Sequence, residues 1–102
     1  MARLLVLYKT PKNPEAFDKH YQAVHIPLAK KIPGLQRYDI STGTVGTPAG
    51  ASDVYLVAAL DFESTSTIKL GLASPEGQAA AGDLANFADG GVELLIFETE
   101  VV

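Results

Sequence analysis

The segment RLLVLYKTPKNPEAF, residues 3–17, decides the fold because it contains a strand, a break and a helix start in succession. Residues 3–9 are apolar at both odd and even positions, which is typical of a strand covered on both faces. Asn13, Pro14 and Glu15 then supply an amide N-cap, a proline at the first helical position and an acid on the positive end of the helix. The segment therefore predicts a strand that leads directly into a helix.

The helix that begins here carries one apolar stripe at helical spacing, formed by Phe17, Tyr21, Val24 and Leu28. Ile32-Pro33-Gly34 ends the element. Inside it, Pro27 has no N–H to donate and its ring crowds the carbonyl of Ala23. We therefore expect the helix to kink or end at this proline.

The remaining elements repeat the same strand-helix-strand pattern. Residues 35–42 alternate as a second strand, with Tyr38 and Ile40 on one face and Arg37 and Asp39 on the other. Residues 43–52 hold three glycines and a proline and predict a loop. Residues 53–62 predict a third strand that is apolar on both faces.

Two helices and a final strand follow. Ser64 is an N-cap for a short helix that ends near residue 72. Ser74-Pro75-Glu76 starts another helix that ends near residue 88, with Ala80, Leu84 and Phe87 toward the core. Residues 92–100 predict a fourth strand.

The order βαββαβ, with right-handed crossovers, predicts an α+β ferredoxin-like domain over residues 1–102 with a four-stranded antiparallel sheet. Both helical segments then cover one face of the sheet. The other face is also apolar in three strands, and monomers rarely expose such a patch. We therefore expect a second copy to cover it in a symmetric homodimer. A chain of this length can bury a core but does not easily enclose a private cavity of several hundred Å³.

Composition excludes several classes of protein. The 102 residues are 47% hydrophobic and 20% charged and include no cysteine, which excludes disulfide frameworks, cysteine-zinc sites and thiol catalysis. No apolar window is long enough for a membrane span and the start lacks a signal peptide, so we expect a cytoplasmic protein without membrane contact. The net charge of −4 argues against non-specific nucleic-acid binding. Cations gather in residues 1–40 and acids in residues 41–102, which indicates either two solvated faces or a self-complementary contact.

One set of motifs resembles the EthD family, which is named for a protein associated with ethyl tert-butyl ether degradation and belongs to the dimeric α+β barrel group. The residues that carry the resemblance are Leu7-Tyr8-Lys9, Pro14, Phe17, Tyr21, His25-Ile26-Pro27-Leu28, Ile32-Pro33-Gly34-Leu35 and Tyr38. It is most specific over residues 4–42. The resemblance implies a homodimer whose two sheets close into a barrel with pockets on its inner face. Relatives in this group include methylmuconolactone methylisomerase, polyketide cyclases, and heme-using or cofactor-free monooxygenases.

His25 and Tyr38 are the candidate catalytic residues. An imidazole is the natural proton carrier near neutral pH, although His25 at a kinked turn can also be a helix cap or a core-rim side chain. The resemblance to the methylisomerase implies that this histidine and Tyr38 lie together in the pocket, where a tyrosine hydroxyl can donate to a developing oxyanion. The alternative for Tyr38 is a half-buried strand aromatic. Tyr8 and Tyr55 are candidate ligand-binding hydroxyls, or packing residues.

His20 lies five residues before His25, about 140° away on an α-helix, so we expect it to be exposed. The two histidines then cannot share a metal ion, and we predict no metal site and no cofactor. The functional hypothesis is an enzyme that moves a proton on a small apolar or aromatic carbonyl or lactone compound, as an isomerase or cyclase does. A non-catalytic carrier of a small hydrophobic molecule, and a cofactor-free or heme monooxygenase, stay open as alternatives.

Overall fold

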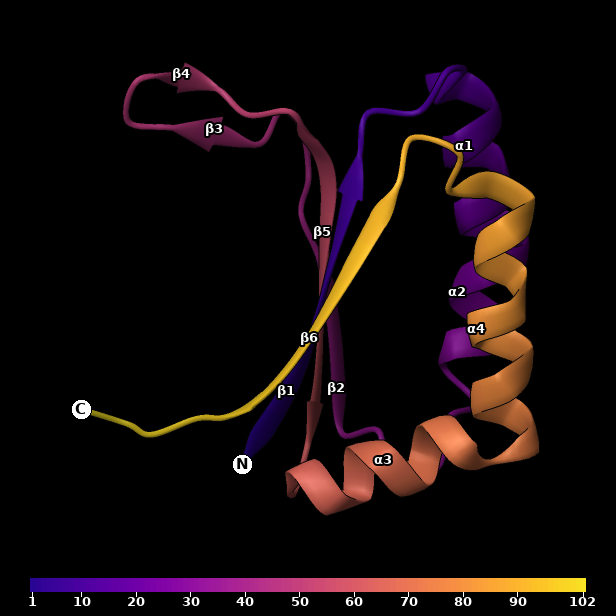
Figure 1. The fold of residues 1–102 in the computed structure, drawn as a ribbon, viewed down its shortest axis with the longest axis vertical. Coiled ribbons are helices and arrows are strands. Elements are labelled where there is room, and N and C mark those ends of the chain that lie inside the picture. The colour runs from indigo at the N-terminus through magenta and orange to yellow at the C-terminus, as the bar shows by residue number, and fades with distance from the viewer.

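In the computed structural model, which describes residues 1–102, a four-stranded antiparallel sheet carries all the helices on one face (Figure 1). The strands of the sheet, in the spatial order β2-β5-β1-β6, are β1 (Ala2–Lys9), β2 (Arg37–Ile40), β5 (Val54–Phe62) and β6 (Val92–Glu98). The helical segments are α1 (Pro14–His20), a π-helical turn (Tyr21–His25), α2 (Ile26–Ala29), α3 (Thr65–Ala73) and α4 (Pro75–Phe87). The predicted fold class is confirmed.

The core lies between the sheet and the helices. The central strand β1 pairs antiparallel with both neighbours, so that Leu4 lies opposite Leu60 on β5 and Ile96 on β6. The even-numbered residues of β1 are buried and face the helices. Tyr8 is the last of them, and it therefore lies in the core at the end of the strand that leads toward α1.

The three helix starts that the sequence predicts are confirmed. Asn13 Oδ1 accepts a hydrogen bond from the Ala16 N–H at 3.1 Å. The Oγ atoms of Ser64 and Ser74 accept from the backbone N–H of the third residue that follows, at 3.1 Å and 3.0 Å. Each cap satisfies one of the N–H groups that a helix leaves without an intrahelical partner.

The first helix differs from the prediction at its centre. The Ile26 N–H bonds to the Tyr21 carbonyl, five residues back, which makes the turn between them π-helical. The buried positions consequently recur every fourth residue, at Phe17, Tyr21, His25 and Ala29. The prediction that Val24 belongs to this stripe was wrong, because the wider turn rotates Val24 outward and leaves it 40% exposed.

Pro27 does not end the helix. The chain stays helical to Ala29. Pro27 cannot donate a hydrogen bond, and its ring crowds the turn before it. That turn is π-helical and therefore wider than an α-helical turn, which leaves room for the ring. The irregularity that the proline predicted is therefore present as a π-helical turn rather than as a helix end.

The segment predicted as a loop contains a short hairpin. Within residues 43–52, β3 (Gly46–Thr47) pairs with β4 (Gly50–Ala51), and Gly50 adopts a φ of 138° that a side chain would disfavour. Short glycine-rich strands have almost no hydrophobic pattern to reveal them. The hairpin and the C-terminal residues both project from the sheet on the side away from the helices (Figure 1).

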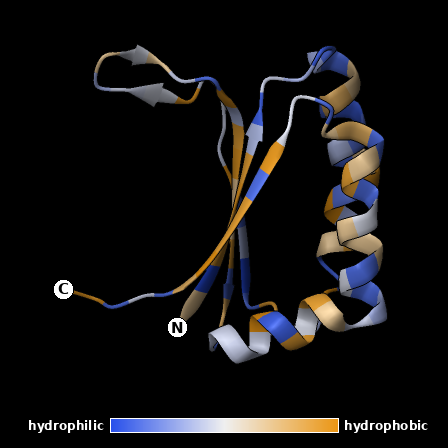
Figure 2. Cartoon of the chain, in the orientation of Figure 1, coloured by the Kyte–Doolittle hydropathy of each residue, from blue (hydrophilic) through white to orange (hydrophobic).

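The helices leave the second face of the sheet uncovered, as predicted. The centre of this face is apolar and is formed by Leu5, Leu7, Val57, Ala59 and Leu95. The edge strand β6 is hydrophobic along most of its length (Figure 2), and residues 94–97 are 37–41% exposed on both of its faces. No helix of the chain is long and apolar enough to cross a membrane.

The π-helical turn can be tested by comparing two asparagine substitutions. Val24→Asn is expected to change the free energy of unfolding by less than about 0.5 kcal/mol, because position 24 faces solvent. Ala29→Asn is expected to cost about 2 kcal/mol or more, because it buries an amide against the core. Urea denaturation of both variants measures the difference. A regular α-helix would instead make Val24→Asn the costly substitution.

Candidate functional site

Three polar side chains meet in a small apolar hollow between the sheet and the helices. The hollow has a volume of about 40 Å³, and apart from His25 its lining is hydrophobic or aromatic. Tyr8 enters it from the end of β1, His25 from the π-helical turn and Tyr38 from β2, where Tyr38 lies opposite Leu60. Leu94 on β6 and Ala81 on α4 are exposed members of the lining, so the hollow opens between these two elements.

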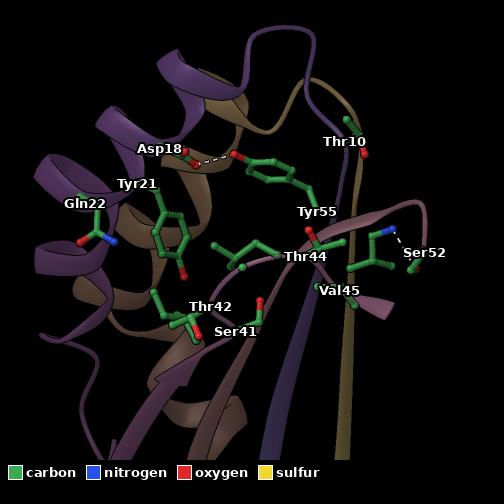
Figure 3. Close-up of a pocket in the computed structure, with 14 residues that line it drawn as sticks. Thr10, Asp18, Tyr21, Gln22, Ser41, Thr42, Thr44, Val45, Ser52 and Tyr55 are labelled. Carbon is green, nitrogen blue, oxygen red and sulfur yellow. Dashed lines mark hydrogen bonds between the residues drawn. The ribbon is translucent and has the colours of Figure 1, made fainter. Parts of the chain in front are cut away.

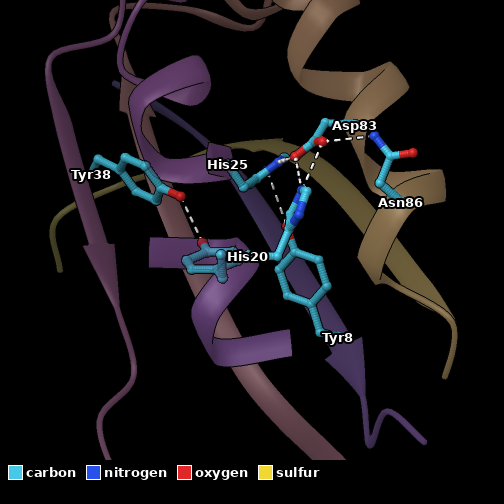
Figure 4. A network of polar contacts seen from close by, with 7 residues as sticks. Tyr8, His20, His25, Tyr38, Asp83 and Asn86 are labelled. Carbon is cyan, nitrogen blue, oxygen red and sulfur yellow. Dashed lines mark hydrogen bonds and ion pairs between the residues drawn. The ribbon is translucent and has the colours of Figure 1, made fainter. Parts of the chain in front are cut away.

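His25 is buried, and each of its ring nitrogens faces a different partner (Figure 4). Nδ1 lies 3.0 Å from Oδ2 of Asp83 on α4, and Nε2 lies 3.4 Å from the Tyr8 hydroxyl. Because an ionised carboxylate only accepts hydrogen bonds, Nδ1 carries the proton. Nε2 is then the basic nitrogen without a proton, and it accepts from the Tyr8 hydroxyl, which also lines the hollow.

Asp83 is 5% exposed and accepts hydrogen bonds from three side chains. His20 Nε2 lies 2.9 Å and 3.0 Å from the two carboxylate oxygens, His25 Nδ1 lies 3.0 Å from Oδ2, and the Asn86 amide donates to Oδ1 at 2.9 Å. Burial raises the pKa of Asp83, but the hydrogen bonds from Asn86, His20 and His25 outweigh it and hold that pKa below its usual value. Asp83 is therefore ionised at neutral pH.

Burial lowers the pKa of His25, against the opposing hydrogen bond and charge of Asp83. His25 is consequently neutral at physiological pH and can accept a proton. Such a side chain, oriented by a buried carboxylate, has the properties of a general base.

Tyr38 is hydrogen-bonded to a second tyrosine. Its hydroxyl lies 2.6 Å from the hydroxyl of Tyr21, which is itself buried in the π-helical turn. One of the two hydroxyls donates to the other, which leaves one hydroxyl hydrogen free for another acceptor. Burial raises the pKa of both Tyr21 and Tyr38, so both keep their protons and act as donors.

His20 differs from the prediction. It is only partly exposed, stacks on Phe87 with the ring centroids 5.1 Å apart, and contacts the same carboxylate as His25. The predicted separation of 140° assumed a regular α-helix, and the π-helical turn between the two histidines removes it. The ring nitrogens lie at hydrogen-bond distance from Asp83, and no group of three or more His, Cys, Asp or Glu side chains is arranged to hold a metal ion.

Asp83, Tyr21 and Asn86 are site residues that the sequence reasoning missed. Asp83 had a usable signal: it is an acid on the buried side of α4, between Ala80 and Phe87. An acid at such a position requires a buried partner. Tyr21 was recognised as a member of the apolar stripe and of the motif that carries the resemblance, but not as the hydrogen-bond partner of Tyr38. Asn86 is exposed, and nothing in its pattern distinguished it.

Tyr55 lines a different cavity from His25, Tyr8 and Tyr38. An open groove of about 590 Å³ lies between α1, the segment after β2 and the start of β5 (Figure 3). A β-bulge opposite Tyr8 and Lys9 leaves Tyr55 without a strand partner, and its hydroxyl donates to Asp18 Oδ1 at 2.8 Å. Tyr21 also lines this groove, so the Tyr21–Tyr38 pair lies between the groove and the hollow.

Known proteins resemble this chain in sequence and in fold. The family model of the EthD domain matches residues 9–91. An uncharacterized 11.0 kDa protein in the thcB–thcC intergenic region of Rhodococcus erythropolis is 42% identical over 104 residues, which cover 100% of this chain and 98% of that protein. The crystal structure of an EthD family protein from Bacillus halodurans has a TM-score of 0.89 and 34% identity, and the match covers 98% of this chain and 99% of that one.

More distant structures share the fold alone. A dimeric protein of unknown function with a ferredoxin-like fold from Bacteroides fragilis has a TM-score of 0.67 at 16% identity, covering 96% of this chain and 95% of that one. SnoaB, a cofactor-independent oxygenase from Streptomyces nogalater, has a TM-score of 0.66 at 16% identity, covering 99% of this chain and 94% of that one. The likeness extends over nearly the whole chain in both cases.

The buried His25 predicts that stability falls as the solution is acidified. Its pKa in the folded protein is lowered, so the unfolded chain, whose histidine titrates near 6.5, binds the proton more readily. Stability is therefore full above about pH 6.5 and is lost as pH falls from there through the folded pKa. Urea midpoints between pH 7.5 and pH 5 measure the slope. The slope is expected to be shallower in His25→Gln and unchanged in Lys19→Gln, and equal slopes in all three proteins would contradict this account.

Proposed function

The chain belongs to the EthD family, and from this premise we propose that it is an enzyme that moves a proton on a small apolar or aromatic carbonyl or lactone compound. The observation that supports the proposal is that both ring nitrogens of His25 are hydrogen-bonded. Nδ1 bonds to the buried carboxylate of Asp83, and Nε2 bonds to the Tyr8 hydroxyl in an apolar hollow. Polar groups that converge in apolar surroundings, with a histidine of perturbed pKa among them, are typical of an active site.

In the proposed reaction, His25 Nε2 removes a proton from the carbon next to the substrate carbonyl. The electrons of that C–H bond form the C=C bond of an enolate, and the carbonyl oxygen becomes negatively charged. The free hydroxyl hydrogen of the Tyr21–Tyr38 pair is the proposed donor to this oxygen. Return of the proton from His25 to a different carbon gives an isomerisation. Attack by the carbanion on a second carbonyl gives a cyclisation, in which the π electrons of that carbonyl move to its oxygen and the resulting alkoxide takes the proton back from His25. The proposal needs no cofactor.

The volume of the hollow, about 40 Å³, is close to that of a single water molecule, which occupies about 30 Å³ in the liquid. Leu94, at its mouth, is 41% exposed and so has few neighbours that restrain it. We propose that the apolar body of the substrate enters between β6 and α4 and displaces this side chain. The reacting carbonyl then lies against Tyr8, His25 and Tyr38 at the base.

The proposal is tested by proton exchange in D₂O. A panel of unsaturated lactones and aromatic β-diketones is incubated with the protein, and deuterium at the carbon next to the carbonyl is followed by mass spectrometry. His25→Gln is expected to lower the exchange rate at least about 100-fold. Tyr38→Phe is expected to lower it about 10-fold, through loss of a hydrogen bond to the oxyanion. Lys19→Gln is the control variant and is expected to exchange like the wild type.

The alternatives predict different results in the same assay. Exchange that His25→Gln leaves unchanged contradicts the role of His25. Binding of a panel compound without exchange indicates a carrier protein. Oxygen consumption that needs His25 favours a cofactor-independent oxygenase, for which the resemblance to SnoaB is the supporting observation. Such a reaction starts with the same deprotonation, after which the carbanion supplies the electrons to O₂.

We also propose that two copies of the chain pack through the uncovered faces of their sheets. The apolar centre of this face, the exposed β6 and the dimeric ferredoxin-like neighbour all support a homodimer. The ion pair of Arg3 and Asp61, 2.7 Å apart, lies at one end of the same face.

Light scattering is expected to give twice the chain mass of 10.8 kDa. Leu95→Glu, at the centre of the face, is expected to give a folded monomer, because each copy would bury an unpaired carboxylate. Leu70→Glu changes a residue that is 74% exposed on α3, which belongs to the helix layer and not to this face, and is expected to leave the dimer intact. A wild-type monomer at micromolar concentration would contradict the proposal.

A further inference from the structure

The two histidines of the chain share one buried carboxylate, although only one of them faces the hollow. We propose that His20 is a further functional residue, a positioning residue that acts through Asp83 and lets His25 accept a proton readily only while His20 itself is uncharged. The inference rests on the proton-transfer role proposed above for His25. It adds a residue that neither touches the hollow nor belongs to the motif by which the chain resembles its family.

The charge of the cluster couples the two histidines. Asp83 has one negative charge, and it accepts from His20 at 2.9 Å and 3.0 Å and from His25 at 3.0 Å. The third donor, the Asn86 amide, is neutral. A single carboxylate can neutralise one imidazolium, and a second positive charge in the same cluster has no counter-charge. Protonation of one histidine therefore opposes protonation of the other.

The two rings differ in how well their surroundings accommodate a positive charge. The side chain of His20 is 27% exposed and that of His25 is 8% exposed. An imidazolium at His20 keeps part of its hydration and has both oxygens of Asp83, whereas an imidazolium at His25 loses nearly all contact with water. A positive charge at His20 is therefore better solvated than one at His25, and it opposes protonation of the His25 ring beside it.

The surroundings of the two rings contain no other acid or base that competes with this coupling. His25 faces Tyr8 from β1, Tyr21 from its own helix and Phe87 from α4. His20 faces Asp83 and Phe87, both from α4. Burial raises the pKa of Tyr8 and Tyr21, so both hydroxyls stay neutral over the range in which histidines titrate. The coupling therefore comes from the shared Asp83 carboxylate and from direct repulsion between the two charged rings.

The two histidines make the test direct, because a long-range ¹H–¹⁵N spectrum shows only two imidazole rings. In the wild type, the neutral His25 ring is expected to carry its proton on Nδ1. His20→Gln keeps an amide N–H near Asp83 and removes the charge. It is expected to raise the pKa of His25 by about half a unit to one unit. Lys19→Gln removes a neighbouring exposed charge and is expected to leave that pKa within about 0.2 of the wild type.

A merely structural role for His20 would lower the melting temperature in His20→Gln without moving the titration of His25, and that result would overturn the inference. His20→Asn, which also lacks the charge, replaces His20→Gln if the latter does not fold. Asp83→Asn is expected to lower the pKa of His25 and to abolish its preference for the Nδ1 proton, because no carboxylate is left to accept from it. An unchanged pKa and tautomer of His25 in a folded Asp83→Asn protein would contradict the role of Asp83.

The outcome is independent of turnover. Absence of proton exchange on every compound of the panel, together with a shifted His25 titration in His20→Gln, would contradict the proposed function and leave the coupling intact. Exchange that needs His25, together with an unshifted titration, would contradict the coupling only. If exchange needs His25 and the titration of His25 also shifts in His20→Gln, the acid limb of the exchange rate is expected to move to higher pH in that variant. The shift is expected to equal the change in the pKa of His25.

Discussion

The buried carboxylate of Asp83 is the interaction on which the rest of the site depends. An isolated carboxylate in a protein interior costs several kcal/mol, and this one is stabilised only because three side chains donate to it. The two histidines lie on the first helical segment and Asp83 lies on α4, so the same bonds join the two helices that cover the sheet. The geometry of the candidate base and the packing of the helix layer therefore have one cause.

The π-helical turn allows both histidines to contact Asp83. On a regular α-helix, residues five positions apart point in directions about 140° apart, and one carboxylate could not contact both histidines. The hydrogen bond from Ile26 to Tyr21 closes a wider turn and brings His20 and His25 to the same side of the helix. The same turn places Tyr21 beside Tyr38. A local irregularity next to Pro27 thus aligns both the candidate base and the candidate donor.

Most of the fold could be predicted from the sequence because its signals are local. Caps at Asn13, Ser64 and Ser74 mark the helix starts, and apolar strands separated by turn residues define the sheet. The α-helical period misplaced Val24 and His20 because it assumes one constant turn, and the π-helical turn breaks that assumption. The hairpin at residues 46–51 has too few apolar residues to show a period.

The site was harder to predict for a different reason. His25, Tyr8 and Tyr38 could be selected by residue type and by resemblance, and the structure brings these three to one hollow. Asp83 lies 58 residues from His25 along the chain, and only the packing of α4 against the first helix makes them neighbours. Tyr55 has the same residue type as the others, yet a β-bulge, which no pattern in the strand revealed, directs it to a different cavity.

Edge strand β6 links the site to the proposed assembly. It is the strand of the sheet exposed along both faces, and Leu94 at the mouth of the hollow alternates with Leu95 on the uncovered face. A partner that covers Leu95 would hold β6 in place from one side and leave Leu94 free to meet an apolar ligand on the other. In such a dimer, a chain too small to enclose a cavity alone would gain a stable wall for its site.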